Sequence, residues 1–272
     1  MARKPAVSSQ FYPDKAEELK KQLKSFFSKL RGRSQKNFGF IAPHAGYVYS
    51  GQAAAYSFKN LQKADTYIIL GTNHYSTGNL IATDDFETPL GILKNDVKFS
   101  ELLLNNKIFK KDEQKFEHSI EVQLPFLQYY NNNARIVPIL VTARDINEIK
   151  KIAELITDAA KQLKRKIYII ASSDFTHYGY SYEFVPFPAD EAKKKIEEID
   201  RKAIISIEKM DAKGFLKAAE KTTICGQGAI AAAIAACRIL GAKKAILLKY
   251  SNSAEISGSY DNAVSYASIL FV

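Results

Sequence analysis

The sequence has 272 residues, 46% of them hydrophobic and 25% charged, which excludes a disordered or fibrous chain and is enough to bury a core without disulfide bonds. The net charge is +10, but lysines alternate with glutamates as they do on solvated helix faces, so we expect no nucleic-acid partner. No run reaches the roughly 18 apolar residues that span a bilayer, and the N-terminus has no signal-like run, so we expect a cytoplasmic protein without membrane contact.

Short apolar strands alternate with amphipathic helices along the chain. In chain order we predict a helix over 14–31 with Asp14 as its N-cap, a strand over 38–43, a helix over 51–62, a strand over 66–71, a two-stranded excursion over 80–96 that turns at 88–91, a helix over 96–106, a strand over 135–141, a helix over 145–164, a strand over 166–173, helices over 189–208, 211–221 and 226–241, and strands over 245–251 and 264–272.

This alternation is typical of α/β proteins, and strands that are apolar throughout indicate burial on both faces of a sheet. We therefore predict an α/β fold with a mostly parallel central sheet flanked by helices, in a single domain over residues 1–272. The alanine-rich helix over 226–241 has almost no polar face, so we expect it to be the central buried helix. The abundance of Lys and Glu, with few Cys and Met, also fits a thermophile.

The four histidines lie in conspicuous places. His44 follows the strand FGFIAP, His74 follows TYIILG, and the pair Asp174 and His177 follows KIYIIASS. If these strands are parallel neighbours, their carboxyl ends meet at the edge where open α/β sheets bind ligands. His118 lies in FEHSIEVQLPF, where Pro125 either starts a helix or kinks it.

A single loop histidine is more often an ordinary surface or core group than a ligand, and Asp174 alone could simply cap a turn. All four histidines, however, lie at such junctions, so a shared site is the better hypothesis. Cys225 precedes the buried helix, whose dipole favours the thiolate form at that end, whereas Cys237 lies in its alanine-rich middle and is expected to be inert.

The motifs PHAGYVYSG, GTNHYSTG, EHSIEVQLPFL, SSDFTHYG and ICGQGAI, in this order, resemble the Memo family over nearly the whole chain. That family is similar in fold to the class III extradiol ring-cleaving dioxygenases, which are non-haem iron enzymes. The resemblance implies that His44, His74 and Cys225 are metal ligands. It also implies that His118, Asp174 and His177 line a cavity beside the metal. Departures from the family pattern lie at Ser8, Ser9, Ala229 and Ser265, none of which is an implied ligand.

The implied ligand set has a thiolate where the dioxygenases have a carboxylate. A thiolate is softer and can itself be oxidised, so the site suits Fe(II), which we expect most, and also copper or zinc. The activity of a ring-cleaving enzyme therefore does not follow from the resemblance alone.

Several functions remain open at this stage. The first is a metal-dependent oxidoreductase in which His118 or His177 moves a proton, Asp174 orients a histidine, and Tyr47, Tyr75 and Tyr178 either shape an aromatic-lined cleft or simply pack.

The second is a binding module that holds a small-molecule or peptide ligand without turnover, like the phosphotyrosine-type adaptor role described for animal members of the family. The resemblance also suggests a radical SAM protein as a partner. The last is zinc-dependent hydrolysis, which needs only a bound water and a general base.

Overall fold

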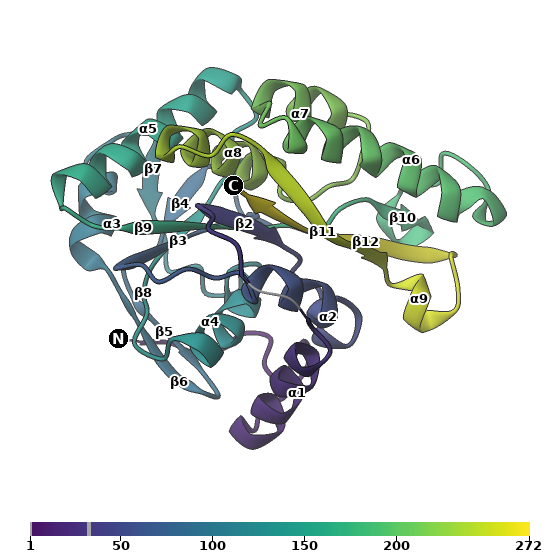
Figure 1. Ribbon diagram of the computed structural model, residues 1–272, viewed down its shortest axis with the longest axis horizontal. Coiled ribbons are helices and arrows are strands. Elements are labelled where there is room, and N and C mark those ends of the chain that lie inside the picture. The colour runs from purple at the N-terminus through teal and green to yellow at the C-terminus, as the bar shows by residue number, and fades with distance from the viewer. Residues whose placement is uncertain (1, 32–33) are drawn as a thin grey trace.

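One sheet of twelve strands organises the computed structural model, which describes residues 2–31 and 34–272 (Figure 1). The strands are β1 (Ala2–Arg3), β2 (Gly39–Ala42), β3 (Thr66–Gly71), β4 (Asn79–Ile81), β5 (Asp85–Thr88), β6 (Gly91–Asn95), β7 (Phe109–Lys111), β8 (Arg135–Leu140), β9 (Ile167–Ser172), β10 (His177–Gly179), β11 (Ala245–Asn252) and β12 (Asn262–Phe271). The helices are α1 (Ala16–Ser28), α2 (Tyr47–Phe58), α3 (Val97–Leu104), α4 (Leu124–Tyr130), α5 (Ile146–Gln162), α6 (Ala189–Glu208), α7 (Ala212–Ala219), α8 (Gln227–Leu240) and α9 (Ala254–Ser257), with single 3₁₀ turns η1 (Glu121–Gln123) and η2 (Tyr180–Tyr182).

The sheet is mixed. Its centre, in the order β6-β8-β3-β9-β2, is parallel. Strand β12 then runs antiparallel to β2, β10 and β11, and β4 runs antiparallel to β8. The prediction of a mostly parallel sheet therefore describes the centre and not the whole sheet.

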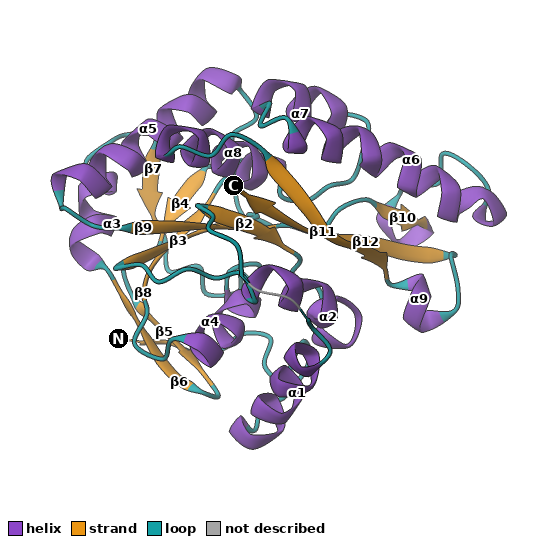
Figure 2. Ribbon diagram, viewed as in Figure 1, coloured by secondary structure: helices purple, strands orange, loops and turns teal. Residues whose placement is uncertain are grey.

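Helices cover both faces of the sheet, as Figure 2 shows: α5, α7 and α8 lie on one side and α1, α2 and α4 on the other. Strand β3 shows how the sequence supplies both cores. Ile68 and Leu70 point into the first core, and Tyr67 and Ile69 into the second, because successive side chains alternate across a sheet. The strand is consequently buried along its whole length.

The predicted helices and long strands are present, with shifted ends. Helix α8 is buried over most of its length, and α4 begins at Leu124, so that Pro125 lies in its first turn and does not kink it. The excursion over 80–96 contains the antiparallel pair β5 and β6. The N-cap assignment was wrong: α1 begins one residue later than Asp14 would require, with Lys15 at the cap and no side-chain capping bond. No helix within the described ranges is long and apolar enough to cross a membrane.

Candidate metal centre

Three loops bring the candidate ligands together at one edge of the sheet. His44 follows β2, His74 follows β3, and β9 lies between these strands and is parallel to both. The carboxyl ends of the three strands therefore meet at this edge. Cys225 approaches it from the turn that precedes α8.

His44 is 1% exposed, and its Nδ1 lies 3.0 Å from the hydroxyl oxygen of Ser172. That hydroxyl donates its one proton to the carbonyl oxygen of Ser119 at 2.6 Å and accepts a bond from Gln123 Nε2 at 2.8 Å. A serine hydroxyl has a single donor, so His44 Nδ1 must carry the proton in this contact. The other nitrogen, Nε2, is then left with its lone pair, 3.3 Å from Cys225 Sγ.

His74 is held by a carboxylate. Glu117 accepts bonds from the His74 backbone N–H at 2.8 Å and from its ring Nδ1 at 2.9 Å. Burial alone would lower the pKa of His74, but hydrogen bonds to Cys225 and Glu117 raise it to about 9. Burial likewise opposes ionisation of Glu117, yet the bonds and charge of His74 lower the pKa of this carboxyl to about 2.

The pair is therefore ionised at neutral pH, with the second proton of His74 on Nε2 beside the thiol. A metal cation bound at Nε2 would replace that proton, while Glu117 would keep the one on Nδ1.

Cys225 approaches the histidines closely because its neighbour is a glycine. A Cβ built on Gly226 would lie 2.5 Å from the Cβ of Ser173, so a larger residue would push the turn away from β9. The Gly226 N–H donates to Ser173 Oγ at 2.9 Å, which ties the turn to the strand end. The sulfur itself lies within 3.8 Å of the hydroxyls of Thr72 and Ser173.

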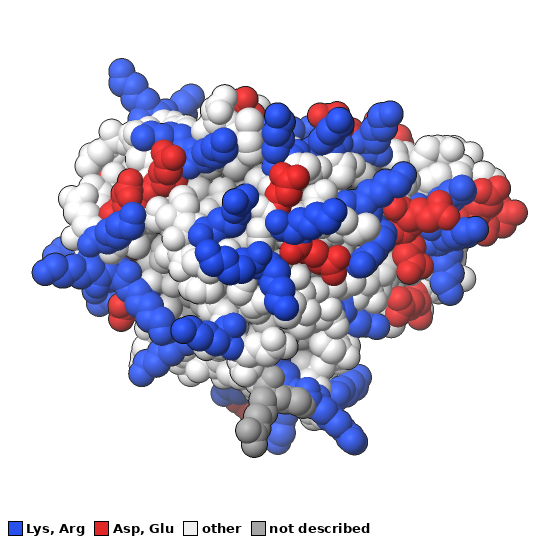
Figure 3. Space-filling model, turned by 45° about the horizontal axis from the view of Figure 1, so that its top comes forward, with Lys and Arg blue, Asp and Glu red and all other residues white. Residues whose placement is uncertain are grey.

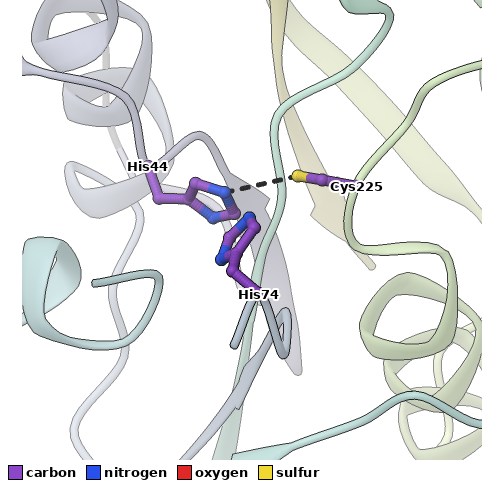
Figure 4. Close-up of side chains that lie close together, drawn as sticks. All are labelled: His44, His74 and Cys225. Atoms are coloured by element: carbon purple, nitrogen blue, oxygen red, sulfur yellow. Dashed lines mark hydrogen bonds between the residues drawn. The ribbon is translucent and has the colours of Figure 1, made fainter. Parts of the chain in front are cut away.

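The donor atoms of His44, His74 and Cys225 lie within 4.8 Å of one another. Figure 4 shows the two rings approaching each other edge to face, with centroids 5.3 Å apart, and the cysteine sulfur facing them. Two imidazole nitrogens and one thiolate are a donor set that binds iron, copper or zinc.

His118 lies directly beside this triad. Its ring stacks on that of His74 with centroids 4.4 Å apart, and its Nδ1 is buried without a hydrogen-bond partner among the described residues. Burial, together with repulsion from His44 and His74, lowers the pKa of His118 to about 3. His118 is thus a neutral imidazole, and it forms a second candidate ligand group with His74 and Glu117.

Asp174 lies in the loop that follows β9, and His177 is the first residue of β10. Asp174 accepts the backbone N–H of His44 at 2.8 Å, while its second oxygen is 4.0 Å from the ring. It therefore fixes the loop of His44 rather than a ring tautomer. His177 Nδ1 lies 2.9 Å from the carbonyl oxygen of Phe175 and 3.1 Å from that of Thr223, so it donates to them and Nε2 keeps its lone pair.

The comparisons with known proteins concern the family and the fold of the chain. The model of the family described as Memo-like protein matches residues 3–270. The chain belongs to this family. It is 41% identical over 275 residues to a MEMO1 family protein of Methanosarcina barkeri, covering 98% of this chain and 99% of that one. It is also 40% identical over 289 residues to one of Pyrococcus abyssi, covering 99% of each chain.

A solved structure shares the fold of this Memo-like chain. The crystal structure of an uncharacterized protein from Escherichia coli K12 has a TM-score of 0.53 and 10% identity, covering 87% of this chain and 100% of that one. At this identity the likeness concerns the fold alone.

Two of the three motif tyrosines of the Memo-like chain do not line the site. Tyr47 packs in the core with Phe126 and donates to the carbonyl oxygen of Val122, and Tyr178 donates to that of Phe187. Only Tyr75 is exposed next to the histidines, with its ring centroid 6.3 Å from that of His74.

The residues that orient the candidate ligands were not singled out from the sequence. Glu117 adjoins His118 in the FEHS motif, and an acidic neighbour of a candidate histidine is a signal that could have found it. Ser172 and Gln123 carried no such signal, because their roles depend on contacts 128 and 80 residues away along the chain.

Proposed function

We propose that this Memo-like protein binds one metal ion through Nε2 of His44, Nε2 of His74 and Sγ of Cys225. Fe(II) is the metal we expect, and copper or zinc could take its place. The proposal depends on one observation above all: each ring already gives its Nδ1 proton to a fixed acceptor, Ser172 or Glu117, while Nε2 of His44 lies 3.3 Å from the sulfur and the donor atoms of all three residues lie within 4.8 Å of one another. This is the orientation that metal-binding histidines adopt.

A bound iron or copper ion would supply redox chemistry, and this favours an oxidoreductase of the kind suggested by the resemblance to extradiol dioxygenases. The residues of the chain would handle protons around it. His118 is neutral and its Nδ1 forms no hydrogen bond to the described residues, so it can hydrogen-bond a substrate beside the triad, while its low pKa disfavours holding an added proton. His177 offers a lone pair on Nε2.

The test is metal content in matched variants. Replacing His44, His74 or Cys225 by alanine removes one ligand and should abolish stoichiometric binding of Fe(II), copper and zinc, measured by mass spectrometry after anaerobic reconstitution. The matched controls are His118→Ala and His177→Ala, which should keep the metal but lose any turnover. Metal lost in His177→Ala and kept in Cys225→Ala would contradict the assignment.

The metal found also separates the candidate reactions. Iron or copper with oxygen-sensitive spectra supports redox chemistry. Stoichiometric zinc supports hydrolysis, which needs a bound water and a general base.

A further inference from the structure

A second polar region lies at the opposite edge of the sheet, where β2 and β9 begin and α5 and α8 end. It contains a cavity of about 710 Å³ whose lining includes the cations Lys36, Lys161, Lys164, Arg165 and Lys166 and no acidic residue. Figure 3 shows basic side chains over much of the face it draws, with acidic ones among them. This cavity gives the excess positive charge a defined location.

Most of these cations are not neutralised by the chain. Lys161 has Asp158 at 3.2 Å, but Lys36, Lys164 and Lys166 form no ion pair within the described ranges. Like charges around one cavity repel each other, and the repulsion is relieved when an anion enters. The charge arrangement is therefore that of an anion site.

Arg165 lies next to a buried carboxylate. Its Nε lies 3.4 Å from Oδ2 of Asp96, a carboxylate that is 1% exposed and accepts a bond from Thr66 at 2.6 Å. The two terminal nitrogens of the guanidinium make no hydrogen bond to the described residues. Nε is buried and makes no hydrogen bond to the described residues, so the ion pair with Asp96 leaves the donors of the guanidinium available for a carboxylate or a phosphate.

Lys164 occupies a position that normally belongs to glycine. Helix α5 ends in a Schellman motif, in which the N–H of Arg165 donates to the carbonyl oxygen of Ala160 and that of Lys164 to Lys161. Lys164 has a φ of 52°, in the left-handed region that side chains other than Asn and Asp rarely adopt. The backbone therefore tolerates glycine at this position, which allows the side chain of Lys164 to be removed without disturbing the end of the helix.

One wall of the cavity is apolar. It includes Phe38, Leu240 and Ile239, and Ile239 is 45% exposed. Inorganic phosphate would leave this wall uncovered, whereas a ligand that joins phosphates to a ring system would contact both the wall and the cations.

We propose that this cavity binds a small organic polyphosphate of the nucleoside triphosphate class, with its phosphates at Lys164, Arg165 and Lys166 and its ring against Phe38 and Ile239. The site lies at the amino ends of β2 and β9, whereas His44 follows the carboxyl end of β2. It is therefore independent of the metal centre.

The proposal is tested by calorimetric titration of the full chain with adenosine triphosphate, inorganic triphosphate and adenosine, without added divalent metal. Adenosine triphosphate should bind at least about 10-fold more tightly than either fragment. Lys164→Gly should raise its Kd by about 10-fold or more, because a charge-assisted bond is lost. The melting temperature of this variant should not fall, because glycine suits the backbone there. Lys193→Ala, which removes the same charge from the exposed face of α6, is the matched control and should bind as the wild type does.

Any of four results would overturn the proposal. The first two are that adenosine triphosphate does not bind at millimolar concentration, or that Lys164→Gly and Lys193→Ala bind it with equal Kd values. The others are that inorganic triphosphate binds as tightly as adenosine triphosphate, or that a single-stranded oligonucleotide binds more tightly than it. Cys225→Ala should bind the nucleotide unchanged. Lost binding in that variant would place the nucleotide at the metal centre and contradict the assignment.

Discussion

Ser172 holds His44 by a contact of 3.0 Å between its hydroxyl oxygen and the ring Nδ1. Because the contact decides which ring nitrogen keeps its lone pair, Ser172→Ala should weaken metal binding by about 10 to 100-fold while leaving the three ligands in place. The affinity can be measured by competition with a chelator. Ser57→Ala, which removes another fully buried hydroxyl but one bound to Ile41, should not change it. Equal affinities in the two variants would show that the ring is oriented by other contacts.

The two cysteines should differ in reactivity. Cys237 is fully buried in α8, and burial raises the pKa of its thiol well above the usual range, whereas Cys225 is partly exposed. Iodoacetamide should therefore modify Cys225 and spare Cys237 in the folded, metal-free protein, as peptide mass spectrometry would show. Prior loading with zinc should protect Cys225. Equal labelling of both thiols would contradict the packing of α8.

The pair of Arg3 and Glu121 should matter greatly for stability. Arg3 Nη1 lies 2.6 Å from Glu121 Oε2, and the carboxylate, which is 0% exposed, also accepts a bond from Tyr12. Arg3→Ala would leave a buried charge unpaired and should lower the free energy of unfolding by about 3 kcal/mol.

The neighbouring pair of Lys4 and Glu87 provides the control. Lys4 is 77% exposed, so Lys4→Ala should cost less than about 1 kcal/mol. Urea denaturation would measure the free energy of unfolding of both variants. Similar decreases in this free energy would show that the buried pair is no stronger than the exposed one.

Asp200 should make stability depend on pH. It is fully buried in α6 and accepts bonds from Ser265, from Thr176 at 2.6 Å and from Tyr250 at 2.7 Å. Burial outweighs these donors and raises the pKa of the carboxyl. The folded state then holds this proton more tightly than the unfolded chain does. The contribution to stability is present below the unfolded value of about 3.9 and is lost as the pH rises through the raised folded value.

Asp200→Asn removes the ionisation and nearly keeps the shape. The free energy of unfolding of the wild type should therefore fall relative to this variant between pH 4 and pH 7, measured by urea denaturation. If the free energy of unfolding of the wild type instead rises relative to that of the variant as the pH rises, the three hydrogen-bond donors outweigh burial.

The sequence predicts the centre of the fold better than its periphery. Strands β3 and β9 are apolar throughout because both faces are covered, so their bounds are predicted to within a residue. Strands β4, β7 and β10 are three residues long, and their pairing depends on tertiary contacts that leave no pattern in so short a stretch. The antiparallel direction of β11 and β12 was missed for a different reason, because direction is set by connections and not by composition.

The candidate site likewise has a part that the sequence predicts and a part that it does not. Histidines after predicted strands mark the edge of the sheet, and their clustering follows from the order of three parallel strands. The partners that set the ring tautomers cannot be inferred in this way, because any buried hydroxyl or carboxylate could serve. The assignment of Cys225 as a metal ligand came from the family resemblance. The sequence alone did not indicate how far Cys225 lies from the histidines.

Strand β12 pairs with β2, the strand that leads to His44, although the two are far apart in the sequence. During translation β2 leaves the ribosome long before β12 is made, so one edge of β2 stays unpaired on the nascent chain while β12 is missing. Long-range pairing of this kind makes folding slow. The histidine loops thus gain their final support late in synthesis, and a half-made chain offers metal ions in the cell no finished pocket to occupy.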